Sequence, residues 1–372
     1  MTNNRQYRFV RGLEFKVIQL LMLCNIWFTG LRLYKNPFTS FHALKKLLIH
    51  GKKVNAGLTL RKAFYHQGKY GWNMFHPLWP STAFNRFFYH HLEEMIPSGK
   101  NLSVRRLLLV AITKRCPLQC EHCSEGETLN KKDKLSYDQL ERKMEDLVQS
   151  GISALVYSGG EPLNRFDDMI RLARRFANET SQWVYTSGFG LTLEKARVMK
   201  EAGIEGVAIS LDHHEEAHHN TFRGHQEAYQ WAMKAIENCK EAGLLTCINI
   251  CPTRSFIAAN GMEKILELVK KLDVPMVNVL EPRAVGNYAG KDVEWQLVEK
   301  VYLEALHKEL TLSDKYTDYP LFTYPAVARQ HVGCGGGSRY LFLDYDGVLR
   351  PCPFCKTALT AANQNKILCE AT

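Results

Sequence analysis

Acidic side chains are scarce at the start of this 372-residue chain. Residues 1–100 contain only three Asp and Glu but fifteen Lys and Arg, whereas the rest of the chain is close to neutral, so the net charge of +10 belongs to this segment. This scarcity excludes an acidic or evenly charged N-terminal surface. A basic segment can bind anionic lipid, nucleic acid or an acidic protein, or it can be a solvated basic face.

The chain also lacks internal repeats, low-complexity tracts and a long hydrophobic run. Its composition, 45% hydrophobic and 23% charged, predicts a sizeable core rather than disorder. The stretch 17–31 is uncharged for fifteen residues, which is short for a transmembrane helix of about 20 apolar residues, and no small-residue cleavage site follows it. We therefore expect either an interfacial helix flanked by Arg and Lys or a buried helix of an N-terminal domain.

A fourth cysteine is missing from the stretch CPLQCEHC, residues 116–123. Cysteine is otherwise common, because the chain has eleven and seven of them form two close groups. The first group is Cys116, Cys120 and Cys123, and the second is Cys334, Cys352, Cys355 and Cys369. Close groups in a large chain indicate metal or iron–sulfur sites in a reducing compartment rather than a disulfide scaffold.

Strand and helix patterns alternate from residue 105 onward. The expected strands are 106–113, 152–160, 182–188, 205–212, 244–251 and 274–282. The expected helices are 136–151, 166–178, 192–203, 228–243, 261–273 and 292–310. Six such units require right-handed crossovers and a parallel sheet, which predicts an α/β fold with a partial (β/α)6 TIM-like barrel. The loops after the strands are then the expected place of the chemistry.

Three domains are expected along the chain. Residues 1–100, rich in aromatic residues and histidine, predict a small irregular or helical extension, and residues 101–310 hold the barrel. Residues 311–372 predict a small cysteine-rich domain, in which 340–352 alternates like a hairpin with its turn at Asp346–Gly347.

Candidate ligands follow the expected strands. Three thiolates after the first strand suit an iron–sulfur cluster with one open iron, and a Cys3His zinc site using His122 or another histidine is the alternative. The sequence GGEP, 159–162, follows the second strand and offers close backbone approach and a carboxylate. For the histidine-rich stretch 212–220, we favour substrate contact or solvation over a zinc site.

The C-x3-C-x2-C loop after the first strand of a partial barrel resembles the radical S-adenosylmethionine (SAM) superfamily. The resemblance implies that Cys116, Cys120 and Cys123 hold a catalytic [4Fe–4S] cluster whose open iron binds SAM. It also implies reductive cleavage of SAM to a 5′-deoxyadenosyl radical that removes hydrogen from a substrate. The implied SAM-binding residues are Gly159, Gly160, Glu161, Ser187, Ser210, Asp212 and Arg223; an ordinary surface arginine is the alternative for the last of them.

The tail resembles the SPASM/Twitch extension of such enzymes, because Cys334, Gly347 and Cys352 form a C-x12-G-x4-C unit. This resemblance implies one auxiliary [4Fe–4S] cluster for electron transfer or structure. Its implied ligands are Cys334, Cys352, Cys355 and Cys369, and zinc is the alternative.

We therefore expect a radical SAM enzyme that acts on a peptide or protein, with a lipid or membrane-associated substrate as the alternative. The partners expected are SAM and a low-potential electron donor, flavodoxin or ferredoxin, which the basic N-terminal segment can dock. We expect a cytoplasmic protein with peripheral membrane contact and no nucleic-acid partner. A non-catalytic iron–sulfur electron carrier and a zinc-binding nucleic-acid protein are the rivals of another class.

Overall fold

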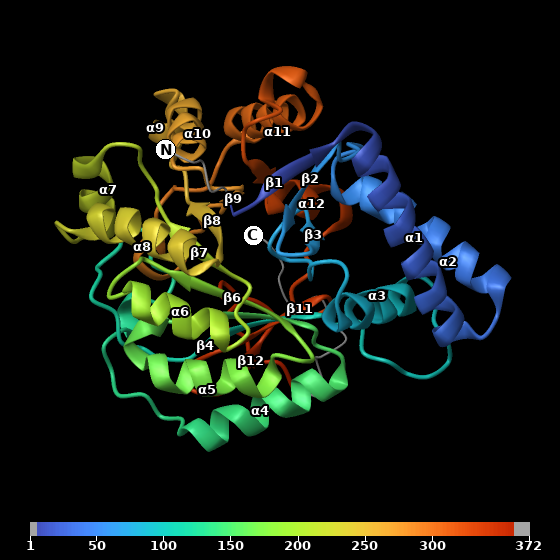
Figure 1. Ribbon diagram of the computed structural model, residues 1–372. Coiled ribbons are helices and arrows are strands. Elements are labelled where there is room, and N and C mark those ends of the chain that lie inside the picture. The colour runs from blue at the N-terminus through green and yellow to red at the C-terminus, as the bar shows by residue number, and fades with distance from the viewer. Residues whose placement is uncertain (1–5, 361–372) are drawn as a thin grey trace.

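The largest sheet of the protein has nine strands (Figure 1). The computed structural model describes residues 6–360. The strands lie in the order β10-β9-β8-β7-β6-β5-β4-β11-β12, and every neighbouring pair is parallel except β11 and β12. Their bounds are β4 (Leu107–Ala111), β5 (Ala154–Ser158), β6 (Ser181–Thr186), β7 (Gly206–Ser210), β8 (Leu245–Ile250), β9 (Met276–Val279), β10 (Leu321–Thr323), β11 (Tyr340–Leu343) and β12 (Leu349–Arg350).

Helices cover one face of this sheet and bury a large apolar core against it. The first of them shows how the sequence sets helix ends: Ser136 caps it through a capping box with Gln139, and Gly151 with φ +134° follows its last turn. The helices of this region are α4 (Tyr137–Ser150), α5 (Phe166–Phe176), α6 (Leu193–Glu201), α7 (Glu216–Arg223), α8 (Ala228–Ala242), α9 (Arg254–Ala258), α10 (Gly261–Lys271), α11 (Leu297–Leu312) and α12 (Pro325–Val332).

The six strands and six helices expected from the sequence are all present, with ends that differ by a few residues. The partial-barrel prediction is confirmed, because β4 to β9 form a parallel run and the sheet ends in the edge strands β10 and β12. The expected hairpin is also present, since β11 pairs antiparallel with β12. In addition, β11 lies parallel to β4, so the tail continues the core sheet; the division at residue 310 stays a prediction.

The N-terminal region combines three helices with a small antiparallel sheet, so the prediction of an irregular or helical extension missed its strands. The sheet is β1 (Arg8–Arg11), β2 (Lys62–His66) and β3 (Lys69–Gly71), and the helices are α1 (Gly12–Tyr34), α2 (Pro37–Val54) and α3 (Thr82–Met95). The two residues between β2 and β3, Gln67 and Gly68, both have positive φ, 46° and 83°, as a type I′ hairpin turn requires. Gln is rarer than Asn or Asp at the first of these positions, which hid the turn.

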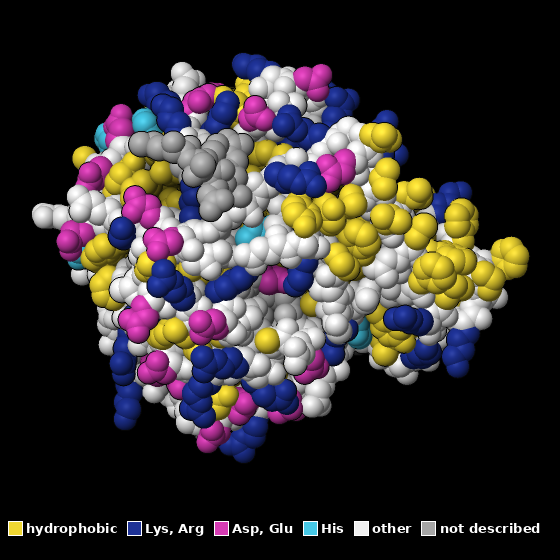
Figure 2. All heavy atoms as spheres, viewed as in Figure 1, with side chains coloured by type: hydrophobic (Ala, Val, Ile, Leu, Met, Phe, Trp, Pro, Cys, Tyr) yellow, Lys and Arg dark blue, Asp and Glu magenta, His cyan; other side chains and the backbone are white. Residues whose placement is uncertain are grey.

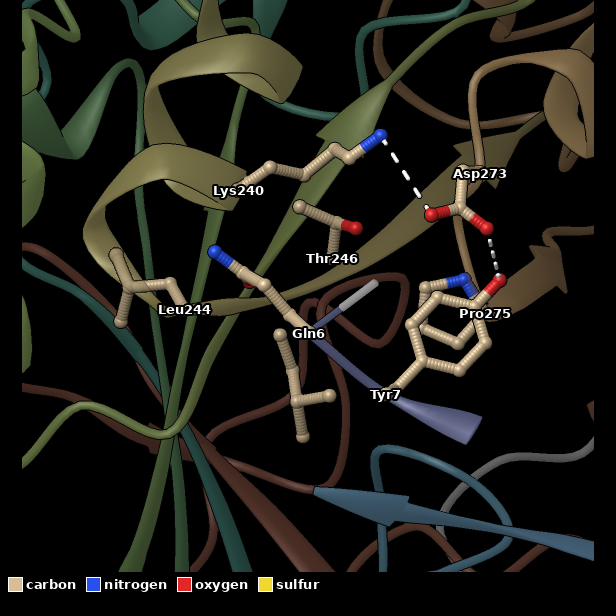
Figure 3. A pocket seen from close by; sticks show the side chains of 8 residues that line it. Gln6, Tyr7, Lys240, Leu244, Thr246, Asp273 and Pro275 are labelled. Atoms are coloured by element: carbon tan, nitrogen blue, oxygen red, sulfur yellow. Dashed lines mark hydrogen bonds and ion pairs between the residues drawn. The ribbon is translucent and has the colours of Figure 1, made fainter. Parts of the chain in front are cut away.

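The small sheet packs on the face of the main sheet that the helices of the core leave open. Tyr7 and Phe64 belong to an apolar cluster with Trp183, Leu245 and Met276. Close by, the Tyr7 hydroxyl donates to Asp273 Oδ1 at 3.1 Å (Figure 3). The N-terminal region therefore closes the inner side of the partial barrel and is part of the core.

The stretch 17–31 lies within α1, a helix that is buried on one side only. Contact of this helix with a membrane stays a prediction. Phe15, Ile18, Ile26 and Leu33 are buried on one side of the helix. By length and composition alone α1 could cross a membrane: its apolar window has a mean hydropathy of 1.4, and 28% of that window is buried.

Candidate functional site

Three cysteines lie on the loop between β4 and α4. Cys120 is buried, Cys116 and Cys123 are half-buried, and all three pack with Leu118 and Trp231 in a small apolar cluster. Burial raises the pKa of the Cys116 thiol to about 12 and that of Cys123 to about 11, and it raises the pKa of Cys120 as well. The three thiols can therefore ionise at this place only when a positively charged group binds to them.

The spacing of the sulfur atoms argues against a single zinc ion. Zinc with four ligands and bonds of about 2.3 Å holds its sulfur ligands only about 3.8 Å apart. Within residues 6–360, one set of three His, Cys, Asp or Glu side chains has all its ligand atoms within 4.8 Å, and that set contains no cysteine. The three sulfur atoms are therefore not all within 4.8 Å of one another, which is wider than one zinc ion needs.

His122, the fourth ligand of the zinc alternative, is a packing residue. Its ring stacks on Phe222 with centroids 4.7 Å apart and an interplanar angle of 8°. Burial lowers its pKa to about 4, so the ring is neutral at physiological pH.

The glycine turn after β5 lies against the start of the cysteine loop. Gly160 N donates to Thr113 O at 2.8 Å, and Glu161 N donates to Arg115 O at 2.7 Å. A Cβ on Gly160 would lie 2.4 Å from Arg115 O, and one on Gly159 would lie 2.6 Å from Thr113 O. The two glycines thus allow close approach of one backbone to another, whereas the sequence pattern suggested approach to a ligand.

The Glu161 carboxylate is buried, and the last residue of β6 and the residue after it supply most of its hydrogen bonds. Oε1 accepts from Thr186 Oγ1 at 2.7 Å, and Oε2 accepts from Ser187 N at 2.9 Å and Ser187 Oγ at 2.6 Å. Burial raises the pKa of Glu161, although these hydrogen bonds oppose the shift. No basic side chain of residues 6–360 forms an ion pair with Glu161 in this structure, so the carboxylate remains available to a bound cation.

A buried ion pair lies on the other side of the cysteine loop. The Arg223 guanidinium donates to Asp212 Oδ2 from Nε at 2.6 Å and from Nη2 at 2.5 Å, and its Nη1 lies 3.7 Å from Cys120 Sγ. Burial alone would raise the pKa of the Asp212 carboxyl, but Arg223 outweighs it and holds the pKa below its ordinary value. Arg223 is only 8% exposed, so the alternative of a surface arginine is wrong.

Two further residues orient Asp212. Cys251 N donates to its Oδ1 at 2.9 Å, and the Asp212 backbone N–H donates to His219 Nδ1 at 3.1 Å. Burial lowers the pKa of His219 to about 4, which keeps the ring neutral and able to accept. Sequence reasoning did not separate His219 from its neighbouring histidines. Ser210 is half-buried at the end of β7, two residues before this carboxylate.

Two backbone segments hold the middle of the cysteine loop. At the end of α7, Gln119 N donates to Arg223 O at 3.2 Å, and a Cβ on Gly224 would lie 2.6 Å from Gln119 O. After β9, Asn287 N donates to Cys123 O and Asn287 Nδ2 to Cys120 O, both at 2.9 Å. Sequence reasoning missed Asn287. Gly286 and Gly290 mark a loop after a strand, but they do not indicate which partners Asn287 contacts.

The second cysteine group also comes together. Cys352 and Cys355 are buried and Cys334 is half-buried. Gly336 N donates to Cys334 Sγ at 3.4 Å, and a Cβ on Gly336 would lie 3.4 Å from both Cys334 Sγ and Cys352 Cβ. Cys369 lies outside the described residues.

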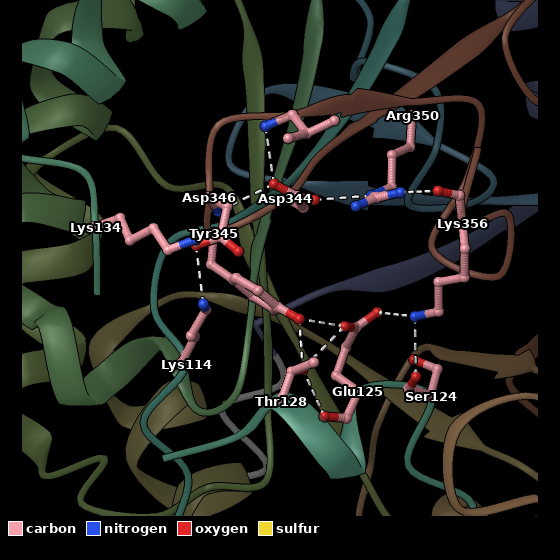
Figure 4. Close-up of polar contacts among 11 residues, drawn as sticks. Lys114, Ser124, Glu125, Thr128, Lys134, Asp344, Tyr345, Asp346, Arg350 and Lys356 are labelled. Atoms are coloured by element: carbon pink, nitrogen blue, oxygen red, sulfur yellow. Dashed lines mark hydrogen bonds and ion pairs between the residues drawn. The ribbon is translucent and has the colours of Figure 1, made fainter. Parts of the chain in front are cut away.

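The hairpin of the tail contacts the residues next to the first cysteine group (Figure 4). The Tyr345 hydroxyl donates to Glu125 Oε2 at 2.6 Å, and Lys356 Nζ donates to Glu125 Oε1 at 2.8 Å. Lys114 Nζ donates to Asp346 Oδ1 at 2.8 Å. The segments beside the two cysteine groups are thus in direct polar contact.

The histidine-rich stretch holds the set of three ligand atoms within 4.8 Å, made by His213, Glu215 and His218. Glu215 and His218 are exposed, and His218 Nε2 lies 3.3 Å from Glu215 Oε2. His214, which has i,i+4 spacing with His218, does not belong to this set. We keep the expectation of solvation or substrate contact for the stretch.

Comparison with known proteins identifies the central part of the chain. Residues 110–255 match the family described as the radical SAM superfamily. The chain is 24% identical over 276 residues to the AdoMet-dependent heme synthase of Nitratidesulfovibrio vulgaris, covering 67% of this chain and 74% of that protein. It is 28% identical over 169 residues to the Fe-coproporphyrin III synthase of Methanosarcina barkeri, covering 45% of this chain and 41% of that protein.

Solved structures share the fold at low sequence identity. Streptococcus suis SuiB bound to its precursor peptide SuiA has a TM-score of 0.58 and 14% identity, with 74% of this chain and 68% of that chain covered. The protein anSMEcpe with bound AdoMet and the Cp18Cys peptide has a TM-score of 0.51 and 18% identity, with 68% and 75% covered.

Proposed function

Since residues 110–255 match the radical SAM superfamily, we propose that Cys116, Cys120 and Cys123 bind a [4Fe–4S] cluster with an open iron for SAM. When bound, the cluster supplies the electron that cleaves SAM, and the resulting 5′-deoxyadenosyl radical removes hydrogen from the substrate. The observation that carries this proposal is the convergence of the segments 159–161, 222–224 and 286–288 on the cysteine loop. Family membership favours this enzyme over a non-catalytic electron carrier.

We assign the ammonium group of SAM to Glu161. A buried carboxylate with hydrogen-bond donors behind it and no cationic side chain beside it favours a bound cation. Gly159 and Gly160 hold this carboxylate at the loop, and Ser187 orients it. We assign Ser210, Asp212 and Arg223 to the ribose and carboxylate of SAM.

We assign an auxiliary [4Fe–4S] cluster to Cys334, Cys352, Cys355 and Cys369. Its support is the approach of Cys334 and Cys352 to Gly336 and the direct contact of the hairpin with the first cysteine loop. A cluster at this place would be close enough in the fold to take part in electron transfer.

We propose a peptide or protein as the substrate. Support comes from the shared fold with SuiB and anSMEcpe, whose solved structures contain peptides. An iron tetrapyrrole is the second candidate, because the two sequence relatives are named heme synthase and Fe-coproporphyrin III synthase. The two candidates are separated by incubating the reduced enzyme with SAM and either Fe-coproporphyrin III or a peptide encoded by a gene next to that of this protein. Mass spectrometry should then show a mass change in only one of the two substrates.

We further propose an acidic low-potential flavodoxin or ferredoxin as the electron donor and the cytoplasm as the place of action. The support is the excess of Lys and Arg in residues 1–100, which attracts an acidic partner.

The chemistry is tested by anaerobic reconstitution, reduction with dithionite and addition of SAM. We expect 5′-deoxyadenosine and methionine as products and their loss in C116A. The matched control is C24S, which removes an exposed cysteine of α1 and should leave product formation unchanged. Absence of both products from a protein with a full cluster would reject the proposal.

A further inference from the structure

Exposed apolar side chains gather on the two N-terminal helices. Nine of the thirteen large hydrophobic side chains that are exposed among residues 6–360 lie on α1 and α2. Figure 2 shows them on the right side of the view, where Figure 1 places these helices. They are Leu13, Val17, Leu20, Leu21, Phe28, Phe38, Phe41, Leu48 and Ile49, and we name the surface that they form the α1–α2 face. Phe38 is 83% exposed. An apolar patch of this kind is unfavourable in water and marks a surface that binds a partner.

The same helices carry positive charge. Between Gly12 and Val54 the only acidic residue is Glu14, and exposed Lys and Arg side chains stand at seven positions. They are Lys16, Arg32, Lys35, Lys45, Lys46, Lys52 and Lys53. None of these side chains forms an ion pair within residues 6–360, so their charge is available to a partner.

We propose that the α1–α2 face binds the surface of a membrane that contains anionic lipid. Exposed Leu, Val and Phe side chains among unpaired Lys and Arg are the combination that enters the boundary between acyl chains and anionic headgroups. An open hollow near the end of α2 adds a second feature. It is lined by Ile49, Lys52, Lys53, Gly57 and His331, and the ammonium groups of its two lysines can bind a headgroup phosphate.

The contacts of α1 favour a helix that lies on the membrane over one that crosses it. Its inner side packs on α2 and α3, and a Cβ on Gly30 would lie 3.2 Å from Ser40 Cβ, so the two helices touch closely. The strand before it, β1, pairs with β2 in the sheet that closes the barrel. A bilayer can therefore reach only the outer side of α1 without unfolding the core.

The α1–α2 face is connected to the second cysteine group through helix α12. Helix α2 packs against α12, which ends two residues before Cys334. This inference does not depend on the proposed radical chemistry, and the two can fail separately.

The test is co-sedimentation of the full chain with vesicles of phosphatidylcholine alone or mixed with phosphatidylglycerol. We expect binding to the anionic vesicles, and weaker binding when the ionic strength rises from about 0.1 M to 1 M, which shortens the Debye length from about 10 to 3 Å. The double variant F38S/F41S should bind at least about tenfold more weakly, because it removes two apolar side chains from the contact. K45E/K46E should lose the preference for anionic vesicles.

The matched control is L297S/V298S, which removes two equally exposed apolar side chains at the start of α11 and should bind like the wild type. Circular dichroism and thermal unfolding of all variants report correct folding, and neither depends on the proposed chemistry. Equal binding by F38S/F41S and the wild type, or no vesicle binding at all, would overturn the inference. Loss of a concentration-dependent dimer in F38S/F41S, without vesicle binding by the wild type, would overturn it too and assign the face to a second copy of the chain.

Discussion

Replacement of Glu161 by Gln separates binding of SAM from assembly of the cluster. The substitution keeps the shape of the side chain and one acceptor oxygen but removes the negative charge. Because burial raises the pKa of Glu161 in spite of its hydrogen bonds, the ionised carboxylate is disfavoured in the protein without a bound cation. A group with a raised pKa stabilises the fold most at low pH and loses that contribution as the pH rises through the folded pKa. E161Q should therefore cost little stability at pH 7, even though one donor of Ser187 loses its acceptor.

The affinity for SAM should fall much further. A hydrogen bond to a charged group contributes about 1.5–3 kcal/mol. Its loss should therefore raise the dissociation constant for SAM roughly 10- to 150-fold. We expect this loss in calorimetric titration of the anaerobic protein with SAM, together with a raised KM for SAM. Iron content and thermal unfolding should stay close to those of the wild type.

S187A is the control, since it removes one hydrogen bond to Glu161 and leaves the charge in place. It should weaken SAM binding less than E161Q does. The assignment of the ammonium group to Glu161 would be refuted by unchanged SAM affinity in E161Q, or by loss of the cluster together with the fold.

Three other substitutions test the rest of the site. G160A should strip iron from the first group and destabilise the protein by roughly 1–3 kcal/mol, because its Cβ would lie 2.4 Å from Arg115 O; iron analysis and denaturant unfolding measure both. D212N breaks the buried pair with Arg223 and should cost about 3–5 kcal/mol. Since the pKa of Asp212 is lowered, the difference in melting temperature should persist above the ordinary aspartate pKa and shrink as the pH falls through the lowered value. C352S should halve the iron content, from roughly eight to four atoms per chain, and leave SAM cleavage in place if the second group holds a separate [4Fe–4S] cluster.

The elements of the barrel were predictable because their signals are local. Each strand of the core is a short apolar run, and α4 carries both its cap, Ser136, and its stop, Gly151. The cysteine loop and the glycine turn were found for the same reason, since each motif lies within eight residues. Arg223 was found as well, but its burial and its pairing with Asp212 across the end of β7 depend on the fold.

The missed residues act through distant partners. Asn287 contacts carbonyl groups more than 160 residues earlier in the chain, and no pattern within GNYAG indicates that. The hairpin between β2 and β3 was missed because its turn, Gln67–Gly68, departs from the common turn sequences. Local chemistry therefore identified ligands, and the residues that hold the ligands in place needed the structure.

The polar residues of the tail hairpin show what this difference means for function. The sequence DYDG predicted a turn, and a turn needs only the aspartate and the glycine. In the structure Tyr345 contacts Glu125, and Asp346 contacts Lys114, one residue from each flank of the cysteine loop. Because β11 also pairs with β4, the strand that leads into this loop, the segments that carry the two cysteine groups are joined through one sheet. A rigid link of this kind suits electron transfer between two clusters, whose rate requires a fixed separation, better than it suits a mobile lid over the substrate.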